Sequence, residues 1–200
     1  MNNKIIIKFF DRAQAVYGPY DEWFTDIQGN SNAVNRTNRM ADRITEFMKI
    51  QKKCPIGTSG CFSTGKMLTF TGQVYEENDS LGSSSYTAPR FILSDGTSIA
   101  FHPTDTGPPL RNYVGHIMVE IDGPNKGKNQ DGYDRFTFII ANDSFTIHPG
   151  GSLNLDRYSG QGNFDYTYAE YSLASWVLLN GNMDYFKCND LNWQTKTSCK

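Results

Sequence analysis

The sequence predicts an α+β domain in which N-terminal helices pack on an antiparallel β-sheet. Up to about residue 53, apolar residues recur every three to four positions, as they do on the buried face of a helix. From about residue 67 they alternate with polar residues, as in strands that bury one face. Helices followed by strands are typical of α+β folds. The 200 residues suit one domain, which we place at 1–200.

The first helical segment carries an apolar stripe that runs to about residue 27. Gly18-Pro19 interrupts it, and Pro cannot continue a helix without losing a hydrogen bond. The segment 29–32 offers a second stop, with Gly29 as a C-cap and Asn as an N-cap. We therefore expect helices that are kinked or broken between 18 and 32. The members of the stripe are Phe9, Ala13, Val16, Tyr20, Trp23, Phe24 and Ile27.

A second stripe predicts an amphipathic helix that begins near residue 31 and ends before Cys54-Pro55. Charged residues occupy its other face, as expected for a helix that covers a core. The helical region of the domain is therefore predicted at 1–53. The buried face of the second helix is formed by Thr37, Met40, Ala41, Ile44, Phe47 and Met48.

The antiparallel sheet is predicted at 67–148. The segment 67–75 alternates as a single strand through Leu68, Phe70 and Val74. The run 90–102 predicts a hairpin, because Asp95-Gly96 is a favoured dipeptide of type I′ turns. Another strand is expected at 114–121. The run 135–148 resembles a second tight hairpin that turns at Asn142-Asp143.

The remainder, 149–200, is predicted as C-terminal loops and a disulfide-closed end. Within it, 148–166 has the composition of a loop. The segment 168–181 suits a helix capped at Gly181 or a strand, and we favour the helix.

Four cysteines occur as two closely spaced pairs, Cys54 with Cys61 and Cys188 with Cys199. The pairs bracket loops of six and ten residues, and neither has the C-x₂₋₄-C spacing of a zinc knuckle. The spacing predicts two local disulfides and hence an extracytoplasmic protein. The alternative is four reduced thiols in a core.

Charge excludes one class of partner. The chain has 19 Lys and Arg against 21 Asp and Glu, a formal net charge of −2. It therefore lacks the basic field that nucleic-acid binding requires, and we predict no nucleic-acid partner. No apolar run approaches the ~20 residues that span a bilayer.

No catalytic motif emerges, and we predict that the chain is not an enzyme. The segment 60–67 nearly fits a phosphate-binding loop, but Met67 replaces the required hydroxyl residue and the flanking strand and helix are missing. His102, His116 and His148 fall on predicted strands without metalloprotease spacing. His102 and His116 can approach each other across strands, but we interpret all three as sheet surface or core. Asp105, Glu120 and Asp156 form no recognisable acid–base pair.

The segment 120–138 is the most unusual stretch of the chain, because glycines and oxygen-bearing side chains crowd into it. Ca²⁺ takes six to eight oxygen ligands, and the glycines at 123, 127 and 132 permit sharp reversals. The spacing is not that of an EF-hand. The alternative is a self-stabilised turn, because Asp and Asn also bond their own backbone. Both interpretations stay open. The candidate Ca²⁺ ligands are Asp122, Asn125, Asn129, Asp131 and Asp134.

Three stretches together resemble bacterial type IV pilin-like proteins and pseudopilins of pilus or type II secretion systems. They are FILSDGTSIAFHP (91–103), MVEIDGPNKGKNQDGYDRFTFII (118–140) and WVLLNGNMDYFKC (176–188). The match to the family pattern keeps Asp122, Gly123, Pro124, Asn129, Gly132, Asp134 and Phe136, with the Pro displaced, and 180–185 at the end. The similarity covers roughly residues 40–200. The prepilin-peptidase site and the hydrophobic helix of the family are absent from the chain.

The resemblance implies a pilin-like head and a structural role in filament assembly. It implies other pilin or pseudopilin subunits as partners, and an inner-membrane anchor through a helix that precedes this chain. The location would be the periplasm or the cell surface. Calcium sites in some pseudopilin heads favour the metal interpretation of the 122–134 segment. The alternative function is a secreted lectin-like or adhesin module that binds ligands through Tyr158, Phe164, Tyr166 and Tyr168.

Overall fold

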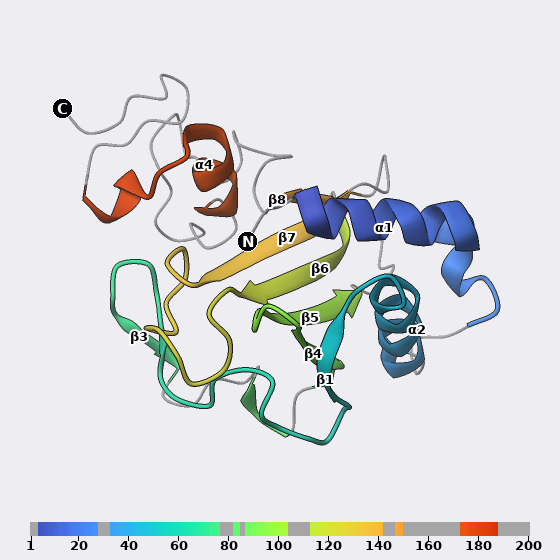
Figure 1. Ribbon diagram of the computed structural model, residues 1–200, viewed down its shortest axis with the longest axis horizontal. Coiled ribbons are helices and arrows are strands. Elements are labelled where there is room, and N and C mark those ends of the chain that lie inside the picture. Colours follow the sequence, from blue (N-terminus) through green and yellow to red (C-terminus); the bar gives the residue numbers. More distant parts are fainter. Residues whose placement is uncertain are drawn as a thin grey trace.

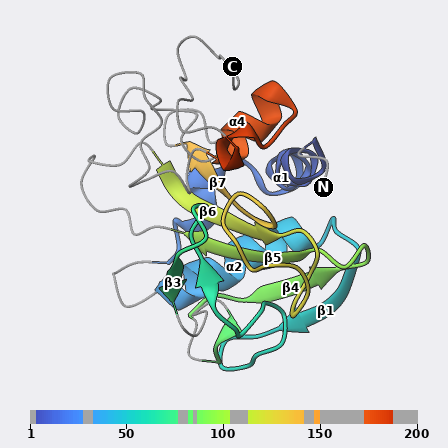
Figure 2. The same cartoon turned by 90° about the vertical axis from the view of Figure 1, so that its left-hand side faces the viewer.

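The computed structural model describes residues 4–27, 33–76, 82–84, 87–103, 113–141, 147–149 and 173–187. Within these ranges the fold is α+β, as predicted, with helices α1 and α2 against one face of a twisted sheet (Figure 1). Figure 2, turned by 90°, looks along α1 and shows α2 behind the sheet. The pilin-like details of the expected fold remain a proposal.

The main sheet has six strands in the order β1-β4-β5-β6-β7-β8, and all neighbours are antiparallel. The strands from β4 to β8 form the predicted meander, while β1 adds to its edge beside β4. The bounds are β1 Ile50–Cys54, β4 Arg90–Leu93, β5 Ser98–Pro103, β6 Tyr113–Glu120, β7 Arg135–Ala141 and β8 Ile147–Pro149.

The main core lies between this sheet and the helices α1 (Lys4–Tyr17) and α2 (Ala33–Thr45). The buried face of α2 is the predicted one, with Met40, Ala41 and Ile44 fully buried. The helical path breaks at Gly18-Pro19, as expected, and continues as a short 3₁₀ helix, η1 (Tyr20–Phe24). Four aromatic rings, those of Phe10, Tyr20, Trp23 and Phe24, pack together at this break.

The prediction that Val16 belongs to the buried stripe of the first helix is wrong. Val16 is 61% exposed, whereas Phe10, which was outside the stripe, is fully buried. The stripe was drawn with one helical period through Gly18-Pro19. Because η1 is a separate 3₁₀ segment after the break, the residues before and after Pro19 do not share one helical face.

The helical region was predicted at residues 1–53, and its predicted C-terminal limit is wrong. α2 stops at Thr45, and β1 (Ile50–Cys54) pairs with β4 through Lys53↔Phe91 and Cys54↔Arg90. Pairing with a strand almost forty residues later overrides the local pattern, which carries too little information in five residues to separate strand from helix.

The segment 67–75 is a hairpin and not one strand. β2 (Met67–Leu68) pairs with β3 (Val74–Glu76) in a separate two-stranded sheet. Thr69 closes the turn, since its N–H donates to the Gln73 carbonyl at 2.8 Å and its carbonyl accepts from Gly72 N–H at 2.9 Å. Phe70 therefore lies in a turn, although its side chain is buried as predicted.

Both predicted hairpins exist, but the turn of the first differs from the prediction. Leu93 N–H donates to the Thr97 carbonyl and Gly96 N–H to the Leu93 carbonyl, so the β4–β5 loop has three residues. Gly96 has φ +89°, but Asp95 is not among the described residues with positive φ, which excludes a type I′ turn. In the second hairpin, Ile140 pairs with Ile147. The turn predicted at Asn142-Asp143 lies outside the described residues.

The predicted C-terminal helix is present as α4 (Leu173–Asn180), and Gly181 follows it with φ +69°. The 3₁₀ helix η5 (Asp184–Phe186) comes next. Cys188, Cys199 and the aromatic set from Tyr158 to Tyr168 lie outside the described residues. Among the residues that the structure describes, no helix has the length and apolar character needed to cross a membrane.

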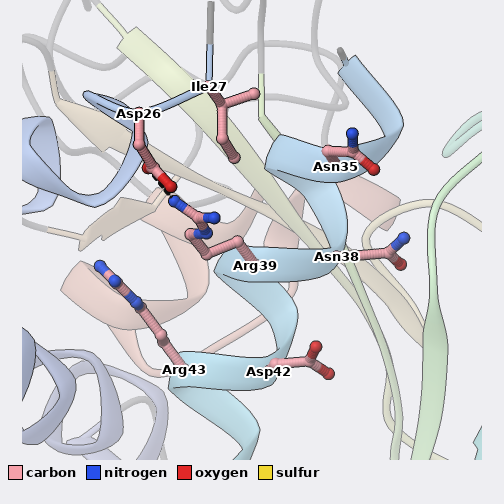
Figure 3. Close-up of a pocket in the computed structure, with 7 residues that line it drawn as sticks. All are labelled: Asp26, Ile27, Asn35, Asn38, Arg39, Asp42 and Arg43. Carbon is pink, nitrogen blue, oxygen red and sulfur yellow. Dashed lines mark hydrogen bonds and ion pairs between the residues drawn. The ribbon is translucent and has the colours of Figure 1, made fainter.

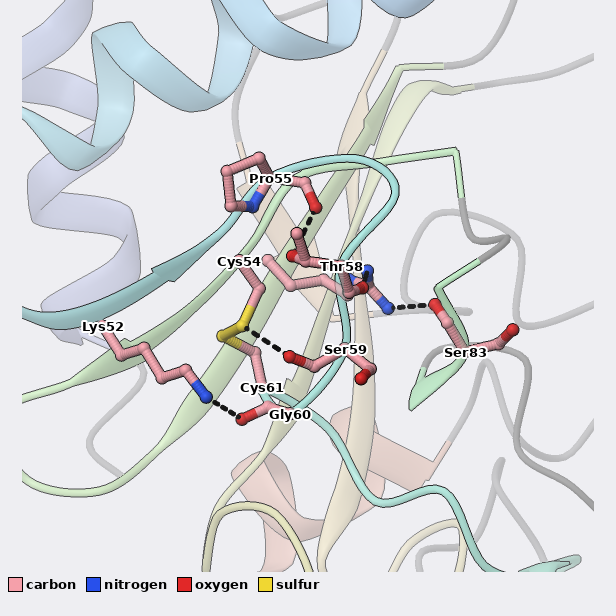
Figure 4. The surroundings of a disulfide bond; sticks show 9 residues. Lys52, Cys54, Pro55, Thr58, Ser59, Gly60, Cys61 and Ser83 are labelled. Carbon is pink, nitrogen blue, oxygen red and sulfur yellow. Dashed lines mark hydrogen bonds between the residues drawn. A yellow bond between two sulfur atoms is a disulfide. The ribbon is translucent and has the colours of Figure 1, made fainter.

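The predicted disulfide between Cys54 and Cys61 is present (Figure 4). The two buried cysteines pack with Phe62 and Ala100. Lys52 Nζ donates to the Gly60 carbonyl at 3.0 Å across the bracketed loop. The buried Arg90 guanidinium donates to the carbonyls of Ser83 and Thr58, the former at 2.6 Å. The disulfide loop is thus fixed to the sheet covalently and through a buried cation.

Candidate functional site

The candidate site is the segment 121–134 between β6 and β7, here called the Gly-rich loop. Its ends are joined by a hydrogen bond of 2.8 Å from Ile121 N–H to the Asp134 carbonyl. Asn125 and Asn129 both have positive φ, 60° and 52°. Asn tolerates this conformation better than most residues, which explains the residue type at these two positions.

The carboxylate of Asp134 organises the second half of the loop. It is 1% exposed and accepts three backbone N–H groups, from Lys128 at 2.6 Å, Asn129 at 2.9 Å and Gln130 at 2.6 Å. Such charge-assisted hydrogen bonds are about twice as strong as neutral ones. This is the self-stabilised turn that the composition allowed.

The first half of the loop places a second carboxylate next to Asp134. A Cβ at Gly127 would lie 1.8 Å from Asp122 Oδ2 and 2.5 Å from Asp134 Oδ2. The two carboxylate oxygens therefore lie close to each other beside Gly127. Burial, followed by the charge of Asp134, raises the pKa of Asp122 above 3.8. Asp122 Oδ1 is buried and has no hydrogen-bond partner among the described residues. The pair is the portion of the loop suited to a hard cation.

The five predicted ligands therefore do not converge as a set. Asp122 and Asp134 lie together, and Asn129 joins them through its backbone N–H while its side-chain Nδ2 donates to the Lys66 carbonyl at 2.9 Å. Asn125 is exposed and Asp131 is half-buried. In the same ranges, no group of three or more His, Cys, Asp or Glu side chains is placed to hold a metal ion. Calcium binding by the five residues stays a prediction, and Asp122 and Asp134 are the two whose carboxylates lie together.

Two basic side chains in or next to the loop, those of Lys128 and Arg135, contact other groups of the domain. Lys128 Nζ lies 4.4 Å from the centre of the Tyr133 ring, in a cation–π contact. Arg135 is buried and pairs across strands with Glu120. The charge of Lys126 opposes the increase that burial and Asp134 cause in the pKa of Asp122.

The Gly-rich loop packs against the small β2–β3 sheet. Gln130 is buried, and its amide donates to the carbonyls of Thr69 at 3.2 Å and Phe70 at 3.0 Å. The backbone of Leu68 completes the contact, donating to the Asn129 carbonyl at 2.9 Å and accepting from Asp131 N–H at 3.0 Å. The segment 129–131 therefore acts as a further strand beside β2.

A buried carboxylate connects the loop to the disulfide region. Glu120, fully buried at the end of β6, accepts the Ser63 hydroxyl at 2.6 Å and the Ser63 N–H at 3.3 Å. The Ser63 hydroxyl in turn accepts Asn125 N–H at 3.0 Å. The Ser63 hydroxyl therefore both donates and accepts within the fold, and it links the Gly-rich loop to the disulfide region.

The C-terminal segment closes over the same loop. The buried Tyr185 hydroxyl donates to the Gly132 carbonyl, and burial raises the pKa of Tyr185. A Cβ at Gly132 would lie 2.7 Å from Leu173 Cδ1, so only glycine allows this approach. Trp176 Nε1 donates to Asn182 Oδ1 at 2.9 Å, which fixes α4 to the segment 180–185.

Sequence reasoning missed Ser63, Gln130 and the role of Glu120. Each is a polar residue without a recognisable motif, and its partner lies 57 to 61 positions away. The only available signal was a glutamate at the end of an apolar strand, which is ambiguous because strand ends are commonly exposed. The rejected phosphate loop at 60–67 leads directly into β2 and has no helix after it.

A polar pocket of about 610 Å³ lies between η1 and the outer face of α2 (Figure 3). Its charged groups are used inside the fold, because Arg39 donates to the Asp26 carboxylate and Arg43 stacks on the rings of Tyr17 and Trp23. The chain continues from Ile27, which lines the pocket, into residues outside the described range. The pocket therefore assigns no ligand. It is lined by Asp26, Ile27, Asn35, Asn38, Arg39, Asp42 and Arg43.

Comparisons with known proteins assign no family to this arrangement. No family model matches the chain, and no solved structure matches it. Peptidase T of Bacillus velezensis is 26% identical over 134 residues, covering 62% of this chain and 31% of the peptidase. The chain thus spans less than a third of the length of that relative. This similarity is too low and too partial to transfer an activity.

Proposed function

We propose that this chain is the head domain of a type IV pilin or pseudopilin, a structural subunit that acts by filament assembly and not by catalysis. One observation carries the proposal. The two most distinctive stretches of the resemblance, the Gly-rich loop and 180–185, pack on each other through Tyr185 and Gly132, which are 53 positions apart. A shared packing role explains why both stretches occur in one chain.

The polar groups of the site favour assembly over chemistry. Asp134, Glu120, Ser63 and Gln130 all bond backbone or side-chain groups of the domain itself. A catalytic site needs groups directed at a substrate, and these are directed at the fold. Such a loop gives a rigid outer surface to a subunit that must survive outside the cytoplasm.

The N-terminal helix supplies the proposed route into a filament. In this proposal α1 continues a hydrophobic helix that anchors the precursor in the inner membrane and later packs against neighbouring subunits. Val16 on α1 is 61% exposed and lies on the helix that this proposal places against neighbouring subunits.

Locating the protein in the source organism tests the proposal. Filaments are sheared from the cells, and an antibody against residues 1–200 is used on the sheared fraction and in electron microscopy. We expect label along filaments and a mature N-terminus that begins with about 20 apolar residues. A monomer in the medium, released by an ordinary cleaved signal peptide, would instead identify the secreted lectin-like or adhesin module. A strain that lacks the gene is the control for the antibody.

A further inference from the structure

Two imidazoles face each other on the sheet surface opposite α1 and α2. His102 on β5 and His116 on β6 are directly paired in the antiparallel register. Their neighbours Phe101 and Ile117 belong to the main core beneath the helices. Since side chains alternate along a strand, the two histidines project from the other face. Their ring centroids are 6.4 Å apart and the ring planes are inclined by 22°.

All three histidines of the chain occupy one row of the sheet. His116 pairs with Ile139 on β7, and Ile139 pairs with His148 on β8. The sequence alone placed them on separate strands and showed only that His102 and His116 could approach each other. Only the register brings His102 and His116 next to each other, with His148 two strands farther along, about 10 Å away in backbone position.

We propose that His102 and His116 form a two-histidine binding site for a divalent transition-metal ion of the Zn²⁺, Ni²⁺ and Cu²⁺ group. Neutral imidazole nitrogen is a preferred ligand of these ions, whereas Ca²⁺ takes oxygen. With Zn–N bonds of about 2.0–2.1 Å, two imidazoles on a tetrahedral ion have centroids about 5 Å apart. The observed rings need a rotation that brings them together by roughly 1 Å.

The sheet provides the rigidity that such a site needs. His116 is paired on both sides, with His102 and with Ile139, and His102 is held by its pairing with β6 beyond the end of the β4–β5 ladder. Preorganised ligands bind more tightly because less conformational entropy is lost. Both residues are half-buried, and the Nε2 atom of His116 is itself buried. Both histidines have further contacts in the fold, and a ligating imidazole ordinarily keeps such a contact on its second nitrogen.

Calorimetric titration with Ni²⁺ and with Zn²⁺ tests the site on the full chain without a histidine tag. We expect one ion per chain, at least tenfold weaker binding in His102→Gln and in His116→Gln, and binding within twofold of wild type in the control His148→Gln. A hundredfold excess of Ca²⁺ should not compete. Binding should weaken in acid, since protonated imidazole cannot ligate.

Several outcomes overturn the proposal. They are the absence of saturable binding, unchanged affinity in both His102→Gln and His116→Gln, or an equal loss in His148→Gln. Unfolding of the metal-free variants is checked by circular dichroism. If a variant does not fold, the Cu²⁺ paramagnetic resonance spectrum of the wild-type chain decides, because two coordinated imidazoles split the signal and an oxygen-only site does not. The test is independent of the filament, because a chain that fails to assemble can still bind the ion.

Discussion

At the residue scale, the carboxylates of the Gly-rich loop have opposite energetic effects. Asp134 satisfies three backbone N–H groups that have no strand partner, which compensates for leaving regular structure between β6 and β7. Asp122 lies against the same Gly127 and gains no partner for its buried Oδ1 within the described residues. One carboxylate therefore stabilises the loop, while the other is held at an electrostatic cost.

Replacing Asp134 with alanine should strongly destabilise the domain. Asp134→Ala leaves three loop N–H groups without an acceptor, and we expect a loss of about 3 kcal/mol in urea unfolding. Asp42→Ala is the matched control, since its carboxylate is 61% exposed and makes one surface ion pair with Lys53. That variant should lose less than about 1 kcal/mol. Equal losses in the two variants would contradict the assigned role of Asp134.

The raised pKa of Asp122 predicts a pH-dependent stability difference. The folded state holds this proton more tightly than the unfolded state, whose pKa is near 3.8, so stability is lost as pH rises through the folded pKa. Asp122→Asn removes that cost. In chelator, it should stabilise the domain at pH 7 and give little gain at pH 3, measured by urea unfolding. An equal gain at both pH values would refute the electrostatic explanation.

The same pair provides the calcium test. If Ca²⁺ binds between Asp122 and Asp134, it neutralises their repulsion, and a chelator should lower the melting temperature of the wild-type chain. Asp122→Asn and Asp134→Ala should both abolish that response. A melting temperature that is insensitive to Ca²⁺ and chelator would leave the hydrogen-bonded turn as the complete explanation of the loop.

At the scale of elements, α2 shows how periodicity places a helix. Its apolar residues recur on one face, and that face covers β5 and the aromatic cluster at the α1–η1 break. Arg43, on the charged face, is not a simple solvated residue, because its guanidinium lies 4.8 Å from the Tyr17 ring centre and 5.5 Å from that of Trp23.

Two aspartate substitutions on α2 separate its faces. Ile44 is fully buried, so Ile44→Asp places a charge in the main core and should cost at least about 3–5 kcal/mol or prevent folding. Val34 is 43% exposed near the helix start, where a negative charge is favourable. Val34→Asp should therefore change the unfolding free energy by less than about 0.5 kcal/mol. Comparable losses would show that the buried face of α2 is assigned wrongly.

At the scale of the whole molecule, the Gly-rich loop joins segments of the chain that are remote in sequence. Ser63 near the disulfide, Gln130 against β2–β3 and Tyr185 after α4 each contribute one of these contacts. Disruption of the loop should therefore affect the stability of several segments together.

The number of free thiols tests the predicted compartment for the whole molecule. The Cys54–Cys61 disulfide is present, and the predicted Cys188–Cys199 pair lies outside the described residues. A thiol reagent added to unfolded, unreduced protein from the source organism should detect almost no free cysteine. Two free thiols would restrict the prediction to the first bridge, and four would exclude the extracytoplasmic assignment.

The sequence by itself determined the fold class, the buried face of α2, the break at Gly18-Pro19, the meander of strands and the spacing of Cys54 and Cys61. These are local properties, because periodicity and turn residues act over a few positions. Tertiary structure decided β1, the β2–β3 hairpin, the turn registers and the pairing of Asp122 with Asp134. These features depend on partners tens of residues away or on strand register, and no local pattern encodes either one. The same reason explains why three scattered histidines form one row only in the folded sheet.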